Sequence, residues 1–196
     1  MRKKLLLAIA FSLGIWAYVL TLAAGPRAGN ATAVAPVDAD DGITALFSPS
    51  GGCTEALVSE INKASQTLDI QAYTFSSVPI AQAIANAYDR GVKVRVILDK
   101  SQRADHLSVA NFLQTHHVLV YIDDQHGIAH NKVMLIDGKV LITGSFNFTK
   151  SSEERNAENL LIIKSRPKLI SAYQSNFEHH FGHSIPFGSP VKAKVE

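Results

Sequence analysis

The chain has 196 residues, of which 46% are hydrophobic and 18% are charged. This length suits one ordinary domain with a short appendage, and the composition excludes a charge-rich disordered chain. The formal net charge is +2, but residues 1–24 hold three of the 19 Lys and Arg and none of the 17 Asp and Glu. The 16 remaining basic side chains against 17 acidic ones exclude the broad basic surface of a tight DNA-binding protein. Any contact with nucleic acid should therefore be confined to a cleft.

The N-terminal segment has the pattern of an export signal. Three basic residues at positions 2–4 precede an uncharged apolar run at 5–24. The run approaches the roughly 20 residues needed to span a bilayer, so residues 1–24 are expected to be a cleaved signal peptide or a signal anchor. The protein is then periplasmic or secreted, or anchored in the inner membrane and facing the periplasm. Cys53 is the sole cysteine, which excludes an intrachain disulfide.

The remaining chain is expected to form one domain at 42–185, after a linker at 25–41 and before a tail at 186–196. Apolar spacing predicts strands at 43–47, 68–75, 92–98, 118–122 and 160–163, and helices at 53–64, 80–90, 106–115 and 167–181. Two more strands are expected within 129–145, joined by a turn at Asp137-Gly138. This alternation with an antiparallel hairpin predicts an α/β fold, a mixed β-sheet flanked by helices.

The predicted hairpin gathers polar side chains at its open end. A two-residue turn pairs His130 with Ser145 and Lys132 with Thr143, and directly opposed residues share a face. Asn147 continues the same alternation, so it should lie beside these four residues. The opposite face of the hairpin is expected to be apolar, with Val133, Leu135, Val140 and Ile142.

An imidazole, an ammonium, a hydroxyl and an amide in one place suit a phosphodiester substrate. The imidazole can attack phosphorus while the other groups hold the non-bridging oxygens, so this set demands no metal. Each residue alone has an ordinary explanation, because a strand lysine is usually solvated and a lone histidine is usually structural. The grouping of these residue types favours a catalytic site.

The spacing of these residues resembles a family signature. His130-x-Lys132, Asp137 after four residues and Gly144-Ser145-x-Asn147 after six more are similar to the His-x-Lys-x4-Asp-x6-Gly-Ser-x-Asn motif of the phospholipase D superfamily. Over residues 43–181 the chain looks like the Nuc-like single-motif bacterial endonucleases of that superfamily. The resemblance implies a phosphodiesterase that works through a covalent phosphohistidine, without a cofactor.

The resemblance also implies a role for each matching residue. His130 would be the nucleophile, Lys132 and Asn147 would bind the phosphate, and Ser145 would support that binding. Glu158 would accept a hydrogen bond from the second ring nitrogen of His130 and so fix its tautomer. Asp137 belongs to the motif, but the hairpin places it in the turn, away from the other residues. We therefore expect a structural role for this carboxylate.

The mechanism needs two imidazoles, one to attack phosphorus and one to protonate the leaving oxygen, whereas the chain carries one motif. A homodimer that shares one active site across a two-fold axis meets this need. The alternative is a monomer in which another histidine, such as His126, serves as the acid.

Several of the eight histidines raise the question of a metal site. The candidate ligands form two groups: Asp123, Asp124 and His126, and His179, His180 and His183. On the closing helix His179 and His183 share a face, while His180 falls beside Phe181. At most two ligands are thus expected to align, and no bound metal is predicted.

Four functions are compatible with the sequence. The leading interpretation is a non-specific, metal-independent endonuclease that cleaves DNA or RNA. The second is a phospholipase D or cardiolipin hydrolase, which an N-terminal anchor would hold near a membrane. An inactive nucleic-acid or membrane-binding module is disfavoured because no motif position is missing. Nothing in the sequence favours the fourth, a structural protein of a secretion apparatus.

Overall fold

The structure is a computed structural model that describes residues 36–39 and 42–190. The expected export signal, most of the expected linker and residues 191–196 lie outside the described residues. Within the described part, no helix is both long enough and apolar enough to cross a membrane.

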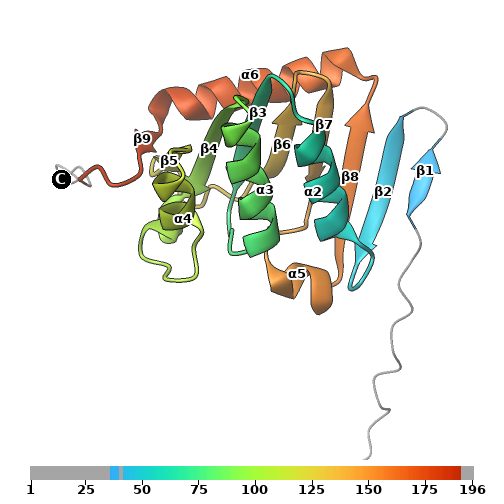
Figure 1. Cartoon of the computed structure of the whole chain (residues 1–196), viewed down its shortest axis with the longest axis horizontal. Helices are drawn as coiled ribbons and strands as arrows, with labels where there is room; N and C mark the ends of the chain where they lie inside the picture. Colours follow the sequence, from blue (N-terminus) through green and yellow to red (C-terminus); the bar gives the residue numbers. More distant parts are fainter. Residues whose placement is uncertain (1–35, 40–41, 191–196) are drawn as a thin grey trace, which may run out of the picture. The chain divides into compact units, whose positions relative to one another are not determined.

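A mixed β-sheet is the centre of the described domain (Figure 1). Its strands follow the order β1-β2-β8-β7-β6-β3-β4-β5-β9. The strands β3, β4 and β5 are parallel, and the other neighbouring pairs are antiparallel. The expected mixed sheet is therefore confirmed. The nine described strands are β1 (Val37–Ala39), β2 (Ile43–Ser48), β3 (Thr67–Ala72), β4 (Lys93–Asp99), β5 (Leu119–Asp123), β6 (Lys132–Ile136), β7 (Val140–Gly144), β8 (Glu158–Lys164) and β9 (Ile185–Pro186).

Helices pack on both faces of this sheet. The main core lies between one face and the helices α2 (Cys53–Lys63), α3 (Val78–Asp89) and α4 (Ala110–Thr115). A smaller core lies between the other face and α6 (Pro167–His183). The apolar residues of α3 recur every three or four positions and are buried, as the sequence pattern predicted: Ile80, Ala83, Ile84 and Ala87.

Four short elements were not expected from the sequence. They are β1, β9, the 3₁₀-helix η1 (Lys100–Arg103) and the helix α5 (Lys150–Glu154). The linker prediction is wrong at residues 37–39, which form β1 and pair with β2. The expected boundary at residue 185 is also misplaced, because β9 crosses it and the Phe187 N–H donates to the Val120 carbonyl.

The helix α6 is fixed to the sheet by an ion-pair network around Arg95. The guanidinium donates to the buried Asp69 carboxylate through Nε at 2.7 Å and to Glu178 through Nη2 at 2.7 Å. Its carbon also lies 4.8 Å from the centre of the Phe177 ring. Because Glu178 and Phe177 both belong to α6, these contacts set the position of the C-terminal half of that helix.

The hairpin of β6 and β7 has a different register from the expected one. Ile136 lies opposite Val140 and Val133 opposite Thr143, so the turn spans residues 137–139. This shift of one residue places Thr143 on the face that packs against α6. The prediction that Thr143 joins the polar group is therefore wrong. Val140 and Ile142 also lie on the opposite face from the expected one, because both pack with Met134 in the core beneath α2 and α3.

Several strands begin or end together at one end of the sheet, which we call the site edge. Ala72 at the end of β3 lies opposite Lys132 at the start of β6, and Ser48 at the end of β2 lies opposite Glu158 at the start of β8. The end of β7 is at the same edge, because Gly144 pairs with Leu160. This edge brings together residues that are more than 100 positions apart in the chain.

Candidate active site

His130 and Lys132 stand at the start of β6, next to the end of β3. The His130 side chain is exposed, and its ring centre lies 4.5 Å from that of Tyr73. Lys132 is 6% exposed, and its ammonium donates to the His130 carbonyl at 2.9 Å. The same ammonium lies 5.0 Å from the centre of the Tyr73 ring, within the range of a cation–π contact. An accessible imidazole thus stands directly beside a buried positive charge.

The electrostatics of Lys132 suit an anionic substrate. Burial lowers the pKa of its ammonium, and the negative charge of Glu158 acts in the opposite direction. A phosphate beside Lys132 would add a second negative charge and stabilise the protonated ammonium further. The arrangement can therefore neutralise charge on a phosphorus centre attacked by His130.

Ser145 and Glu158 form a hydrogen-bonded pair across β7 and β8. The Ser145 hydroxyl donates to Glu158 Oε2 at 2.6 Å and accepts from the Asn159 N–H at 3.1 Å. The second carboxylate oxygen of Glu158 accepts from Asn156 Nδ2 at 3.0 Å. Among the described residues these are the side-chain partners of Glu158, so the predicted bond from His130 to Glu158 is not present. The bulged end of β7 brings the Ser145 hydroxyl to this carboxylate instead.

That bulge has a clear backbone signature. The N–H groups of Ser145 and Phe146 both donate to the Asn159 carbonyl, at 3.1 and 3.3 Å. Phe146 and Phe148 are then fully buried in the main core. Asn147 lies between these two anchors in the chain, and its place beside His130 and Lys132 stays a prediction. Its amide oxygen is buried without a hydrogen-bond partner among the described residues, which leaves a polar group for a ligand to satisfy.

Asp137 lies at the far end of β6 from Lys132, in agreement with the expected structural role. Its carboxylate accepts from the N–H groups of Gln66 and Thr67, at 2.8 and 2.9 Å, and from the Ser65 hydroxyl at 2.8 Å. Burial raises the pKa of this carboxyl, but the hydrogen bonds from Thr67, Gln66 and Ser65 outweigh that effect and hold the pKa below its usual range. Asp137 therefore ties the hairpin turn to the start of β3.

The comparisons with known proteins agree with this arrangement. A family model described as cardiolipin synthase, PLD-like domain matches residues 57–181, well over half of the chain. The chain belongs to the phospholipase D family. A phospholipase D of Rickettsia prowazekii is 46% identical over 135 residues, which cover 69% of this chain and 65% of that protein. The chain thus spans just under two thirds of the length of this relative.

Two further proteins are similar to this chain. A mitochondrial cardiolipin hydrolase of Xenopus tropicalis is 37% identical over 116 residues, or 59% of this chain and 55% of that protein. The crystal structure of Nuc from Salmonella typhimurium, a phospholipase D family member, superposes with a TM-score of 0.72 at 28% identity. That match covers 75% of this chain and 98% of Nuc, so the expected family fold is confirmed.

We expect an Asp137→Asn variant of this phospholipase D family member to lose stability but keep its specific activity. An amide replaces one acceptor oxygen by a donor that faces the Ser65 hydroxyl, which should cost about 1 kcal/mol in this partly exposed turn. Because the folded pKa of Asp137 is depressed, its contribution is present above the unfolded value of about 3.9 and is lost as pH falls through the folded value. Urea denaturation at pH 7 and pH 3 measures the loss of stability and its dependence on pH.

The matched control for that substitution is Asp89→Asn, which removes the same charge from an exposed position at the end of α3. This control should show no comparable loss at pH 7. A loss of turnover in Asp137→Asn at full folding would instead assign Asp137 to the chemistry.

Three further residues of the site make contacts that the sequence did not predict. Tyr73 contacts both His130 and Lys132, and Asn156 bonds to Glu158. Ser48 accepts from the Glu158 N–H at 3.1 Å and so supports the carboxylate from β2. All three residues lie at or just beyond strand ends, which is only a weak indication of a site. The sequence alone does not give the strand order, so it does not show which strand ends are neighbours.

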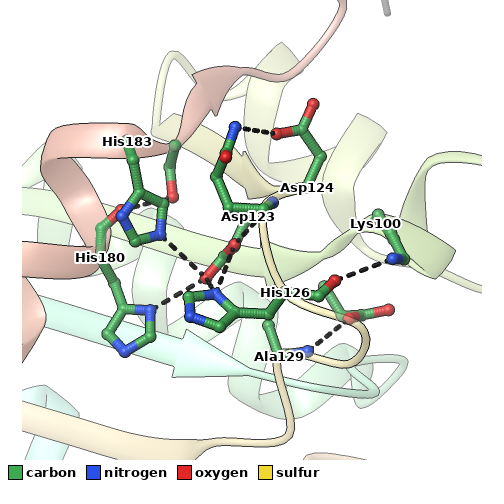
Figure 2. A network of polar contacts seen from close by, with 10 residues as sticks. Lys100, Asp123, Asp124, His126, Ala129, His180 and His183 are labelled. Atoms are coloured by element: carbon green, nitrogen blue, oxygen red, sulfur yellow. Dashed lines mark hydrogen bonds and ion pairs between the residues drawn. The ribbon is translucent and has the colours of Figure 1, made fainter. Parts of the chain in front are cut away.

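The prediction for the histidines is wrong in one respect. Four side chains, which we call the Asp123 cluster, converge beside the C-terminal end of α6 (Figure 2): Asp123, His126, His180 and His183. His180 and His183 lie three residues apart on α6 and face the end of β5, whereas His179 is exposed. Four candidate ligands therefore align, rather than two.

Proposed function

We propose that this protein is an exported phosphodiesterase that cleaves nucleic acid without a catalytic metal, through a phosphohistidine at His130. The observation that carries the proposal is an exposed imidazole beside the buried ammonium of Lys132. In the first step a ring nitrogen of His130 bonds to phosphorus and the P–O bond to the leaving group breaks. A second imidazole gives its proton to that oxygen. Water then gives a proton back to the second imidazole and attacks phosphorus, and the P–N bond breaks, which releases the phosphate product and free His130.

The other residues of the site support this chemistry. Lys132 and Asn147 are proposed to hold the non-bridging oxygens, and the bond between Ser145 and Glu158 fixes the end of β7 beside them. The near-neutral charge of residues 25–196 leaves Lys132 as a local attraction for phosphate rather than part of a wide basic surface. This limits the proposed nuclease to loose, sequence-independent contact with its substrate.

Incubation of the purified chain with plasmid DNA, and separately with vesicles that contain labelled cardiolipin, tests the substrate class. A His130→Ala sample is the matched control for contaminating enzymes. Nicked and linear DNA from the wild type alone, with intact cardiolipin, supports the proposal. Release of phosphatidate with intact DNA would assign the chain to the phospholipases instead.

A phospholipase D or cardiolipin hydrolase remains the second candidate, because relatives carry those names and because exposed apolar side chains lie at the same end of the sheet as the site. Of the six large hydrophobic residues exposed in the described part, four lie at or beyond the strand ends of the site edge. They are Phe47, Val78, Leu107 and Ile128. Such a rim can contact a lipid surface, but it equally fits a second protein chain.

We propose that a second copy of the chain covers this rim and completes the site. His130 is exposed, and the chain has one motif where the reaction needs two imidazoles. The alternative acid, His126, has its Nδ1 atom 2.9 Å from Asp123 Oδ2, so this nitrogen is engaged elsewhere. A two-fold axis beside the rim would place the His130 rings of both copies on opposite sides of one phosphorus.

We expect mixing of wild type with an equal amount of His130→Ala to halve the activity of the wild-type protein. Random exchange leaves about a quarter of the dimers wild type in both copies, so half of the good subunits face an inactive one. Native mass spectrometry verifies the exchange, and mixing with His106→Ala, an exposed histidine outside the site, is the control. Unchanged activity per wild-type subunit after verified exchange would exclude a shared site.

Turnover should also survive an excess of chelator when it is measured well below the melting temperature. The Lys132 ammonium and the site amides supply the positive charge and the hydrogen bonds that a metal would otherwise supply. The rate is compared in buffer, in EDTA and after addition of each divalent ion. Loss of the rate in EDTA under conditions where the chain stays folded, with recovery on one metal, would contradict this mechanism.

A further inference from the structure

The Asp123 cluster joins three separate segments of the chain (Figure 2). Asp123 ends β5 and is completely buried, His126 belongs to the loop before β6, and the other two histidines lie in the last turn of α6. Three ring nitrogens surround Asp123 Oδ2: His126 Nδ1 at 2.9 Å, His180 Nδ1 at 2.9 Å and His183 Nε2 at 3.3 Å. The four ligand atoms all lie within 4.8 Å of one another.

Hydrogen bonding alone leaves this cluster unsatisfied. The Asp123 carboxylate already has three hydrogen-bond partners: His126 Nδ1, at 3.0 Å from Oδ1 and 2.9 Å from Oδ2, His180 Nδ1 at 2.9 Å from Oδ2, and the Gln125 N–H at 3.2 Å from Oδ1. The Nε2 atom of His183 is accordingly buried without a hydrogen-bond partner among the described residues, although it lies 3.3 Å from that oxygen. A buried imidazole nitrogen with no partner is costly in a folded protein unless another group meets it.

We propose that the Asp123 cluster binds one divalent transition-metal ion, with Zn²⁺ as the best-matched ion. Three imidazoles and one carboxylate are a typical ligand set for Zn²⁺, whereas Mg²⁺ and Ca²⁺ prefer oxygen ligands. Both ligand pairs have short spacings, since three positions separate Asp123 from His126 and His180 from His183. A shared cation would replace the contacts between the histidines and Asp123 by one bond from each ligand atom, after small side-chain movements, and would give His183 Nε2 a partner.

The ligand number indicates a structural site rather than a catalytic one. Four protein ligands fill a tetrahedral zinc site and leave no position for a substrate or a reactive water.

The proposed ion would tie the loop before His130 to the body of the domain. This loop is already anchored at two points, because Lys100 Nζ donates to the His126 carbonyl at 2.8 Å and the Ala129 N–H donates to Asp99 at 2.7 Å. A metal on His126 would replace the hydrogen bond of this side chain to Asp123 by a metal–ligand bond, four residues before His130. The ion therefore stabilises the segment that positions the nucleophile, without taking part in the chemistry.

Calorimetric titration of the chelator-stripped chain with Zn²⁺ tests this site directly. We expect one equivalent per chain and a rise in Tm of about 5–10 °C at 100-fold excess over Kd. Mg²⁺ should produce neither effect. Co²⁺ should give the intense visible absorption of a tetrahedral ion, and turnover well below Tm should be the same with and without metal, so this test does not depend on the proposed nuclease activity.

Two variants and a control identify the ligands. His126→Gln and His183→Gln should each weaken Zn²⁺ binding by at least about 100-fold, more than the loss from removing a supporting group around a metal. His126 is the safer variant because its side chain is 43% exposed, so its loss leaves the fold intact. The control is His179→Gln, an exposed histidine on the same helix turn that should bind like the wild type. Absence of stoichiometric binding to the wild type, or equal binding by His126→Gln, would overturn the proposal.

Discussion

Replacing His130 by alanine should reduce turnover to less than a few per cent of the wild-type rate while leaving the fold intact. The imidazole is the proposed nucleophile, and no other group of the site can form the same covalent intermediate. The side chain is exposed at the sheet edge, so its removal opens no cavity and should change the free energy of unfolding by about 0.5 kcal/mol or less. Steady-state rates and urea denaturation of the same sample measure both effects.

The control for this variant is His106→Ala, since His106 is also an exposed histidine but lies outside the site. It should keep full activity. If His130→Ala retained a substantial rate with normal stability, another residue would have to be the nucleophile, and the phosphohistidine proposal would fail.

Gly144→Ala should cost about 3 kcal/mol or more of stability, a large effect for the addition of one methyl group. A Cβ atom at this position would lie 2.3 Å from the Asn159 carbonyl oxygen and 3.0 Å from its carbon, so backbone would have to move. The φ angle of 154° adds to the strain. The movement would fall on the bulge that sets Ser145 against Glu158, so activity should drop as well. Chemical denaturation measures the loss of stability.

Gly138→Ala is the matched control for that change. Gly138 belongs to the same hairpin and has a φ of 62°, but an added Cβ meets nothing within 4 Å. Only the backbone strain of a left-handed residue remains, which is about 1 kcal/mol. Equal losses in the two variants would show that conformation, rather than the contact with Asn159, makes glycine necessary at position 144.

Most elements could be predicted from the sequence because their apolar residues repeat with the period of a helix or a strand. The buried positions of α3 and the alternating strand β4 are examples. The short elements α5 and β9 could not be predicted in this way, since five polar residues and two edge residues carry no period. Their formation depends on tertiary contacts, such as the bonds from Gly52 and Thr54 to Glu153 of α5.

The grouping of His130 with Lys132 was predicted, but the details around it were not. The register failed because the turn closes over three residues, and a sequence containing Asp137-Gly138 does not reveal the added Lys139. The expectation that at most two candidate ligands align was wrong because the group around Asp123 and the histidines of α6 were considered separately. The carboxylate that unites its histidines is Asp123, 57 positions before His180, and only the sheet topology shows that they meet.

Among the described residues, both outermost strands of the sheet are short, which bears on how copies of this protein could associate. The edge strand β1 has three residues and β9 has two, one of which is Pro186. A proline lacks the N–H that a neighbouring strand requires, and strands this short offer few backbone groups to a new partner. Continuation of the sheet from one molecule into the next is therefore disfavoured, which protects against fibrillar aggregation. It also directs any stable pairing of two copies away from the edge strands and toward other surfaces, such as the strand ends around His130.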